Sequence, residues 1–183
     1  MSRNGENNGE TVERFLSEDT IRARVRELAG EISRDYAGKE VTFLGTLNGA
    51  VYFFADLSRF VDIPVEAEFV KVSSYGNSTE SSRLVRFDYS PGSKLKGRHI
   101  LWVEDIVDTG TTAVHLSEHI MKQEPASLKL AALLDKPDRR LHAGVAIDYL
   151  GFTIPDEFVV GYGLDYAGKY RNLPYIGILR FGL

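Results

Sequence analysis

The stretch ILWVEDIVDTGTT, residues 100–112, decides how the rest of the chain is interpreted. Its apolar first half is typical of a buried strand and ends in two adjacent carboxylates, Glu104 and Asp105, before a third, Asp108. Hydroxyls and a glycine then open a helix, whose free backbone N–H groups can hold a phosphate, while the acidic pair suits Mg²⁺ or a ribose diol. We therefore expect a site for a phosphorylated sugar. The alternative is that the acids only cap and solvate a turn, although clustered carboxylates repel one another without a cation.

Outward from this stretch, short apolar segments alternate with amphipathic helical segments along the chain. Such alternation predicts right-handed crossovers and a mainly parallel sheet that is covered on both faces. We expect an α/β fold with a mainly parallel five-stranded sheet flanked by helices, and a small hood of extra strands beside it. The predicted parallel strands are 41–47, 63–72, 98–107, 128–134 and 158–162. The predicted helices run from the N-cap Ser17 to Gly38, over 50–60 and over 110–122, and the extra strands are 84–89, 145–150 and 175–180.

The composition bounds the class of protein. With 183 residues the chain has the size of one domain, and we expect a disordered leader over 1–11 and a single domain over 12–183. It has no cysteine, which is typical of a reducing compartment, and no apolar run near the ~18 residues of a membrane span, so we expect a cytoplasmic protein. Its 22 Lys and Arg against 26 Asp and Glu give a net charge of −4, which disfavours a general nucleic-acid binder.

Residues 100–112 resemble the phosphoribosyl-pyrophosphate (PRPP) binding signature of type I phosphoribosyltransferases, and residues 12–183 are similar to the hypoxanthine-guanine phosphoribosyltransferases in several motifs and in their order. The resemblance implies that Glu104 and Asp105 bind the ribose hydroxyls of PRPP and that Asp108 is the general acid/base beside the purine N7. Trp102 stands where the family more often has an aliphatic residue, and we expect it to pack in the core. The residues implied to bind the 5′-phosphate are Thr109, Gly110, Thr111 and Thr112.

The turn Leu47-Asn48-Gly49 follows a predicted strand. It resembles the family's pyrophosphate loop, in which backbone N–H groups face the pyrophosphate, a cis peptide often occurs, and a glycine lets the backbone approach the ligand closely. Many members have Lys at the position of Asn48, so this chain lacks that cationic side chain. The alternative is an ordinary Asn-Gly turn.

A polar segment over 73–83 is too long for a hairpin turn. Its Ser74-Tyr75-Gly76 resembles the family's mobile catalytic loop, which closes over the active site and keeps water from a reactive sugar cation. Ser74 and Tyr75 are therefore candidate catalytic residues. A plain surface loop is the alternative.

Two later motifs resemble the family's purine site. Lys136, in the Asp-Lys-Pro triplet after a predicted strand, resembles the residue that hydrogen-bonds the exocyclic O6 of the purine, although a lone lysine is usually a solvated surface group. The ring of Phe158 is implied to stack on the base and Val159 to offer it backbone groups, unless both only belong to a core strand. Asp165 is implied to complete the purine site and Arg171 to contact pyrophosphate. The implied cofactor is Mg²⁺, with Glu104, Asp105 and Asp165 as its ligands.

The segment HLSEH, residues 115–119, has the form of an inverted zinc-protease motif. Helical spacing puts His115, Glu118 and His119 opposite the apolar face of the predicted helix, on the solvent side. Because a catalytic zinc needs a third ligand and a shielded pocket, we expect no zinc site here. The chain also lacks the glycine-rich signatures of dinucleotide dehydrogenases and of P-loop NTPases.

The resemblance implies transfer of the 5-phosphoribosyl group from PRPP to N9 of hypoxanthine or guanine, which yields IMP or GMP and pyrophosphate in purine salvage. It implies PRPP and a 6-oxopurine as partners, neither nucleic acid nor membrane, and a homo-oligomer, either dimer or tetramer. Among enzymes, a xanthine- or adenine-specific transferase is the alternative, and the sequence does not rank hypoxanthine, guanine and xanthine. From another class, the alternative is a PRPP-sensing regulator that binds RNA or DNA, against which the net charge of −4 and the short leader count.

Overall fold

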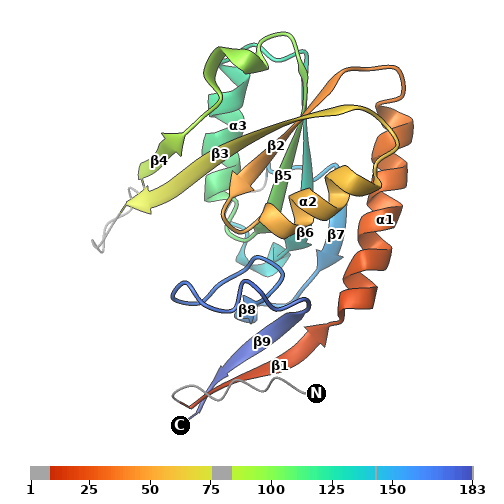
Figure 1. The fold of residues 1–183 in the computed structure, drawn as a ribbon. Helices are drawn as coiled ribbons and strands as arrows, with labels where there is room; N and C mark the ends of the chain where they lie inside the picture. The colour runs from red at the N-terminus through yellow and green to blue at the C-terminus, as the bar shows by residue number, and fades with distance from the viewer. Residues whose placement is uncertain (1–8, 76–83, 143, 183) are drawn as a thin grey trace.

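Six strands form one sheet in the computed structural model, which describes residues 9–75, 84–142 and 144–182 (Figure 1). These strands are β2 (Val41–Leu47), β3 (Val65–Tyr75), β4 (Leu84–Tyr89), β5 (His99–Val107), β6 (Ser127–Asp135) and β7 (Tyr149–Thr153). The order across the sheet is β4-β3-β2-β5-β6-β7, and all neighbours are parallel except β4, which is antiparallel to β3. The predicted α/β class with a five-stranded parallel sheet is therefore confirmed.

The prediction for the fifth parallel strand was wrong. That strand is β7, so the segment 145–150, expected as an extra strand, lies partly in the main sheet beside β6. Within 158–162, only Val159–Val160 form a strand, β8, and it belongs to a second sheet. Gly161 and Gly163 follow with positive φ angles of 99° and 105°, which turn the chain away at once. An apolar run by itself does not indicate which sheet a short strand joins.

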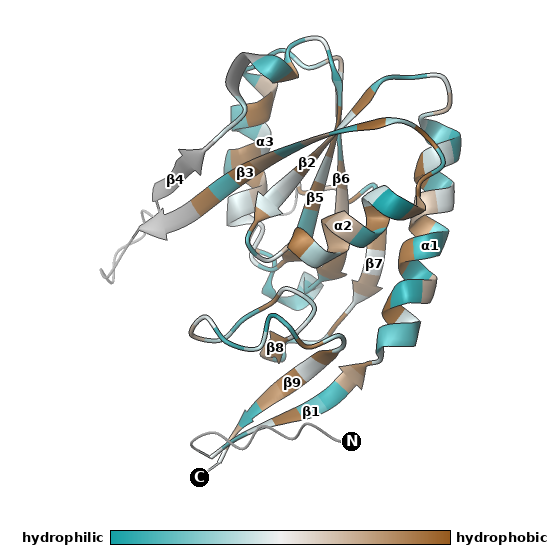
Figure 2. Ribbon diagram, in the orientation of Figure 1, coloured by the Kyte–Doolittle hydropathy of each residue, from teal (hydrophilic) through white to brown (hydrophobic). Residues whose placement is uncertain are grey.

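Helices cover both faces of the main sheet. α1 (Glu18–Asp35) and α2 (Val51–Phe60) pack on one face, and α3 (Thr111–Met121) packs on the other. Their apolar stripes are brown between teal segments in Figure 2. The Ser17 side chain accepts a hydrogen bond from the Thr20 N–H, so the predicted N-cap of α1 is confirmed. Two short 3₁₀ helices, η1 (Gly92–Leu95) and η2 (Pro137–Arg139), lie in the connections.

A second, antiparallel sheet forms the hood. Its order is β1-β9-β8, where β1 is Glu10–Leu16 and β9 is Ile176–Phe181. The hood lies beyond the carboxyl ends of the parallel strands (Figure 1). Glu10 and Thr11, which we expected in the leader, lie in β1 and pair with β9, while residues 1–8 lie outside the described residues. None of the side chains of β1 is fully buried, so this strand has little hydrophobic signal in the sequence.

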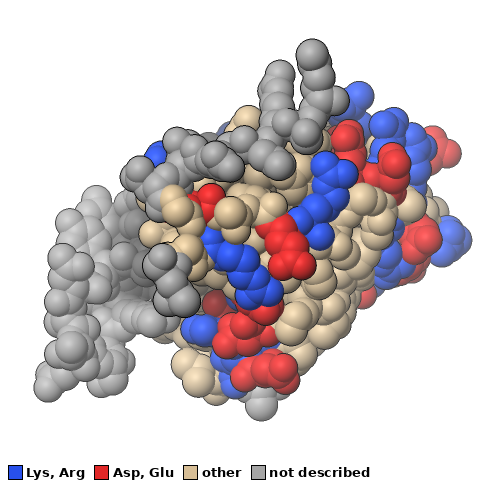
Figure 3. Space-filling model, turned by 90° about the horizontal axis from the view of Figure 1, so that it is seen from below, with Lys and Arg blue, Asp and Glu red and all other residues tan. Residues whose placement is uncertain are grey.

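Basic and acidic side chains are interspersed on the face of the molecule that Figure 3 shows from below. In the hood, Arg180 forms ion pairs with Glu13 at 3.5 Å and with Glu157 at 2.8 Å. Exposed pairs of this kind contribute about 0–1 kcal/mol each to stability. In the part of the chain that the structure describes, every helix is too short or too polar to cross a membrane.

Candidate active site

The two adjacent carboxylates near the end of β5 point to opposite faces of the sheet, because successive side chains of a strand alternate. Glu104 lies on the α3 face and is 6% exposed, and its Oε2 accepts a hydrogen bond from the Thr46 hydroxyl at 2.9 Å. Asp105 points toward the turn between β2 and α2, and its Oδ1 accepts a hydrogen bond from the Ile106 backbone N–H at 2.8 Å. Neighbouring groups therefore hold both side chains in place.

Burial dominates the electrostatics of this carboxylate pair. Burial and then the charge of Asp105 raise the pKa of Glu104 well above its usual range. Burial also raises the pKa of Asp105, although the hydrogen bonds from Glu104 and from the Ile106 N–H, and the charge of Arg171, act in the opposite direction. The pair consequently holds a proton more readily than two exposed carboxylates do, and a cation or a set of hydroxyl donors would release it.

The turn between β2 and α2 lies directly against the carboxylate pair. Its Leu47–Asn48 peptide bond is cis, as the resemblance implied, and the Asn48 side chain is exposed. A Cβ on Gly49 would lie 1.6 Å from Oδ2 of Asp105. From the hood side, a Cβ on Gly163 would lie 1.9 Å from the carbonyl oxygen of Gly49. Three distant segments of the chain therefore meet here, and only glycine permits their close approach.

Arg171 and Asp165 stand on the hood side of this junction. Nη2 of Arg171 lies 2.7 Å from Oδ1 of Asp165, and its Nη1 donates a hydrogen bond to the carbonyl oxygen of Gly163 at 2.6 Å. Oδ2 of Asp165 accepts a hydrogen bond from the Gly168 N–H at 2.8 Å. The structure thus places a guanidinium and a third carboxylate next to the β2–α2 turn, which brings these two predicted residues toward the first two carboxylates.

Asp108 and the hydroxyl-rich loop line a cavity of about 250 Å³, which residues 104–110, Thr112 and Ala113 surround. Gly110 is the N-cap residue just before α3, with a φ of 83°, and as a glycine it has no side chain to cap the helix. The backbone N–H groups of the first turn can therefore bind an anion. Oγ1 of Thr109 accepts a hydrogen bond from the Thr111 N–H at 3.3 Å and lies 3.1 Å from the Thr111 hydroxyl. Three of the four predicted phosphate-binding residues, Thr109, Gly110 and Thr112, line the cavity, whereas Thr111 does not line it and contacts Thr109.

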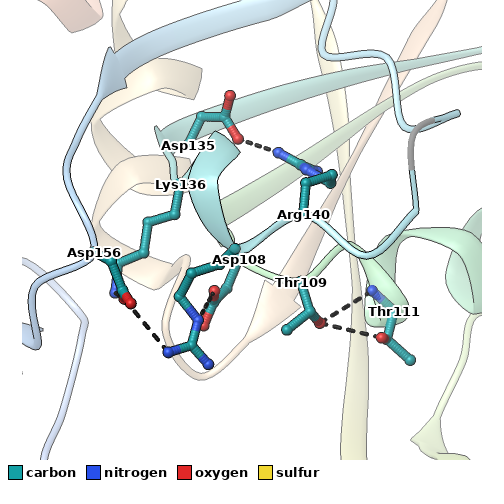
Figure 4. A network of polar contacts seen from close by, with 8 residues as sticks. Asp108, Thr109, Thr111, Asp135, Lys136, Arg140 and Asp156 are labelled. Carbon is teal, nitrogen blue, oxygen red and sulfur yellow. Dashed lines mark hydrogen bonds and ion pairs between the residues drawn. The ribbon is translucent and has the colours of Figure 1, made fainter.

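A chain of charged groups joins Asp108 to Lys136 (Figure 4). Nε of Arg139 lies 2.9 Å from Oδ1 of Asp108, and Nη1 of Arg139 lies 3.4 Å from Oδ1 of Asp156. The same oxygen of Asp156 lies 3.8 Å from Nζ of Lys136. Lys136 is only 7% exposed, so it is not a solvated surface lysine. Among the described residues, the buried Oδ1 of Asp108 has this ion pair with Arg139 but no hydrogen bond of good geometry, so it can accept a proton from a ligand once Arg139 moves away.

Arg139, Asp156 and a further ion pair in this network were not predicted from the sequence. Asp135 and Arg140 form an ion pair in which both side chains are mostly buried (Figure 4). The Arg140 side chain also packs against the backbone of Gly110, at the start of α3. The run DKPDRR over 135–140 was the available signal, because a buried strand seldom ends in so many charges without a partner for them.

The predicted base-stacking residue is oriented by a second aromatic ring. Phe158 is 47% exposed, and Tyr166 meets it edge to face with ring centroids 5.6 Å apart and planes at 88°. Val159 is buried in β8 and pairs with Ile178 of β9. An exposed flat ring beside a buried strand offers a stacking surface for a planar ligand.

Ser74 and Tyr75 are the last residues of β3, where they pair with β4. Residues 73–75, which we expected in the polar loop, are therefore part of a strand. Gly76 and residues 77–83 lie outside the described residues. The catalytic role of Ser74 and Tyr75 stays a prediction.

The candidate metal ligands do not form a cage of their own. Within residues 9–75, 84–142 and 144–182, no three His, Asp or Glu side chains come together as a metal site.

On α3, His115 and Glu118 are exposed, whereas His119 is partly buried with Nε2 3.1 Å from the Ser90 hydroxyl. Burial lowers the pKa of His119.

A larger cavity, of about 320 Å³, lies between α1, α2 and the hood. Its walls include Tyr162, whose hydroxyl donates a hydrogen bond to Asp56 at 2.7 Å. Among the residues whose side chains the structure describes, none that we predicted for the site lines it. We assign the active site to the smaller cavity because the convergent carboxylates and the helix start lie there.

The comparison with known proteins agrees with the class that this fold and site define. The family described as Phosphoribosyl transferase domain matches residues 11–167, and the chain belongs to this family. Its sequence is similar to the hypoxanthine-guanine phosphoribosyltransferase of Streptococcus pneumoniae, with 46% identity over 166 residues, 91% of this chain and 92% of that protein. The resemblance found in the sequence is thereby confirmed.

Solved structures of similar proteins have the same fold. A crystal structure of a hypoxanthine phosphoribosyltransferase from Staphylococcus aureus matches with a TM-score of 0.87 and 42% identity, covering 92% of this chain and 91% of that one. The hypoxanthine phosphoribosyltransferase from Trypanosoma cruzi, solved as a ternary substrates complex, matches with a TM-score of 0.85 and 40% identity, covering 92% and 95%.

Proposed function

We propose that this member of the phosphoribosyltransferase family transfers the 5-phosphoribosyl group of PRPP to N9 of hypoxanthine or guanine, and so salvages purines as IMP or GMP. The observation that carries the proposal is the cavity lined by Glu104, Asp108 and the start of α3, together with the buried Lys136, which Asp156 and Arg139 link to Asp108. Similarity to a hypoxanthine-guanine phosphoribosyltransferase over 91% of the chain supports the choice of base.

The first half of the site suits the phosphoribosyl donor. The open start of α3 and its threonine hydroxyls offer donors to the 5′-phosphate. Glu104 and Asp105 offer acceptor oxygens to the two ribose hydroxyls. Burial favours a proton on this carboxylate pair, and the hydroxyl protons of the ribose can take its place. The Gly49 backbone and Arg171 lie where the pyrophosphate would leave, and a guanidinium binds phosphate oxygens with charge-assisted hydrogen bonds.

The second half of the site suits a 6-oxopurine. Phe158 offers its exposed ring to the base, and Lys136 is a donor-only group that matches the acceptor O6. Asp108 has a buried oxygen to accept the proton of the purine imidazole, once the ion pair with Arg139 yields. A positioned acid/base of this kind contributes about 10²–10⁴ in rate.

The donor set fits Mg²⁺ that arrives together with PRPP. Mg²⁺ usually takes one or two carboxylates plus substrate phosphates and waters, rather than a cage made by protein alone. Glu104 and Asp105 on one side, and Asp165 on the hood side, provide such separate carboxylates. When bound, the metal would neutralise negative charge on the pyrophosphate as the sugar C1–O bond breaks.

Steady-state assays of the purified protein with PRPP and each of hypoxanthine, guanine, xanthine and adenine test this function. We expect IMP and GMP as products, loss of turnover when EDTA removes Mg²⁺, and adenine poorer by about 10⁴ in kcat/KM. Absence of turnover with hypoxanthine and with guanine would refute the proposal. Titration with structured RNA and duplex DNA tests the alternative regulator, for which a nanomolar, sequence-dependent complex is the positive result.

A further inference from the structure

Three side chains on the α3 face of the sheet form a buried hydrogen-bonded chain behind the ribose side of the site. The indole Nε1–H of Trp102 donates to Oγ1 of Thr46 at 2.8 Å, and the Thr46 hydroxyl donates to Oε2 of Glu104 at 2.9 Å. Trp102 is 2% exposed, Thr46 8% and Glu104 6%. All three are thus removed from solvent, so water does not compete for these bonds.

The strand pairing explains why these residues meet. β2 and β5 are parallel neighbours in which Leu44 is paired with Trp102 and Gly45 with Val103, so Thr46 follows beside Glu104. Residues two apart on a strand share a face, which places Trp102 behind Glu104 on β5. From the sequence we expected Trp102 only to pack in the core. It does pack there, and its one polar side-chain atom, Nε1, donates a hydrogen bond to Thr46.

The chemistry of the three side chains allows only one donor-to-acceptor order in this row of hydrogen bonds. An indole N–H only donates, whereas a threonine hydroxyl has one proton to donate and lone pairs to accept with. Because Trp102 donates to Thr46, the hydroxyl proton of Thr46 is left for Glu104. A donor that is itself polarised by a second donor makes a stronger bond to a carboxylate oxygen. An aliphatic side chain in place of Trp102 would leave the Thr46 hydroxyl free to turn.

We propose that Trp102 is a positioning residue for the phosphoribosyl donor: through Thr46 it fixes one oxygen of Glu104, so that the other oxygen is held toward the ribose hydroxyls. The inference rests on the proposed function, in which Glu104 binds those hydroxyls. Oε1 of Glu104 accepts a hydrogen bond from the Asp105 backbone N–H at 3.3 Å, and Glu104 is one of the residues that line the cavity. Trp102 itself does not line that cavity.

Calorimetric titration with PRPP in the presence of Mg²⁺ tests the chain link by link. Trp102→Phe keeps an aromatic ring and removes only the N–H donor, and we expect PRPP to bind about 3–10-fold more weakly. Thr46→Val keeps the shape and removes the hydroxyl, and we expect about 10–100-fold weaker binding, because the bond to a charged group is lost directly. Thr46→Ser restores a hydroxyl and should bind PRPP within about 3-fold of the parent.

The double variant W102F/T46V separates positioning from general destabilisation. Without the Thr46 hydroxyl the indole has nothing to orient, so the double variant should bind PRPP as T46V does, whereas independent structural losses would multiply. The KM for hypoxanthine should stay within about 2-fold of the parent value in every variant, because the hydrogen bonds from Trp102 to Glu104 affect only the ribose side of the site. Ile100→Val is the matched control: it trims the same apolar cluster on the same strand, lowers the Tm by about 2–4 °C and leaves PRPP binding unchanged.

The variant Glu104→Ala distinguishes failure of the proposed role of Glu104 from failure of its positioning by Trp102. If E104A loses PRPP affinity while W102F and T46V bind as the parent does, Glu104 has its proposed role and the positioning by Trp102 is wrong. If E104A binds PRPP normally, the proposed role of Glu104 is wrong and the inference falls with it. If W102F and I100V weaken PRPP binding equally, Trp102 only fills the core, and the inference is overturned.

Discussion

Replacement of Gly49 by alanine tests the junction between the β2–α2 turn, the carboxylate pair and the hood. The added Cβ would lie 1.6 Å from Oδ2 and 2.6 Å from Cγ of Asp105, where ordinary contact needs at least 3.4 Å. Either the turn or the Asp105 side chain must therefore move by about 2 Å, because small adjustments in a packed site cannot relieve an overlap of that size. The turn cannot retreat toward the hood, because Gly163 already lies against the Gly49 carbonyl oxygen.

Asp105 is consequently the group that moves, and it gives up the hydrogen bond from the Ile106 N–H. Overpacking together with a lost bond to a charged group gives an expected loss of about 2–4 kcal/mol in the free energy of unfolding. For a chain of this size that is about 5–15 °C in Tm. Displacement of Asp105 by more than 1 Å should lower kcat/KM for PRPP by about 10²-fold or more.

Differential scanning calorimetry and steady-state kinetics of Gly49→Ala measure the two effects. Gly30→Ala is the control, because Gly30 lies inside α1 and its added Cβ would lie 3.6 Å from Nη1 of Arg34, an ordinary contact. That substitution should stabilise the protein by about 0.5–1 kcal/mol and leave the kinetics unchanged. A Gly49→Ala enzyme with the parent's Tm and kcat/KM would refute the reasoning.

Asp108→Asn should bind PRPP as the parent does but lower kcat by about 10²–10⁴, and calorimetry with single-turnover kinetics checks both halves of that statement. Lys136→Ala should lose most kcat/KM for hypoxanthine and guanine while adenine changes far less, so the ratio between the bases falls; a mutant that still rejects adenine as strongly as the parent and uses hypoxanthine well would contradict the role of Lys136. Hydrogen bonds from Tyr149 and then Lys129 lower the pKa of Asp35. Asp35 therefore stabilises the fold above its unfolded pKa of 3.8, and this contribution is lost as pH falls through the lower folded value. Asp35→Asn should lower the Tm at pH 7 and flatten the Tm–pH curve below pH 4, as thermal scans across about pH 2–7 would measure.

The sequence predicted the structure best where a short run of residues determines both a strand or helix and the place of its functional side chains. The buried strand that ends in Glu104 and Asp105 is apolar because it is central in the sheet, and its acids are close because they are adjacent. The N-cap at Ser17 likewise depends on backbone geometry over a few residues. Such features need no knowledge of the rest of the fold.

Features that depend on contacts between segments far apart in the chain could not be predicted from the sequence. β1 has no fully buried side chain and exists only because β9 lies beside it, and Val159 joins the hood rather than the main sheet for the same reason. The ion pairs of Arg139 with Asp108 and Asp156 join three separate connections of the fold, so no spacing rule could indicate them. The homo-oligomer that the resemblance implied stays a prediction, which light scattering on the purified protein would test.

The pairing of β1 with β9 also sets the order in which the site can be assembled during synthesis. β1 leaves the ribosome before the other described strands and has an unpaired edge until β9, the last of them, has been made. β8, which carries Val159, depends on the same late strand. β5 and the start of α3 have their partners much earlier, in β2 and β6. A growing chain therefore has the parts that hold a sugar phosphate, and the nearby Lys136, before it has the hood strand that carries Val159, and the site is complete only once β9 has been made.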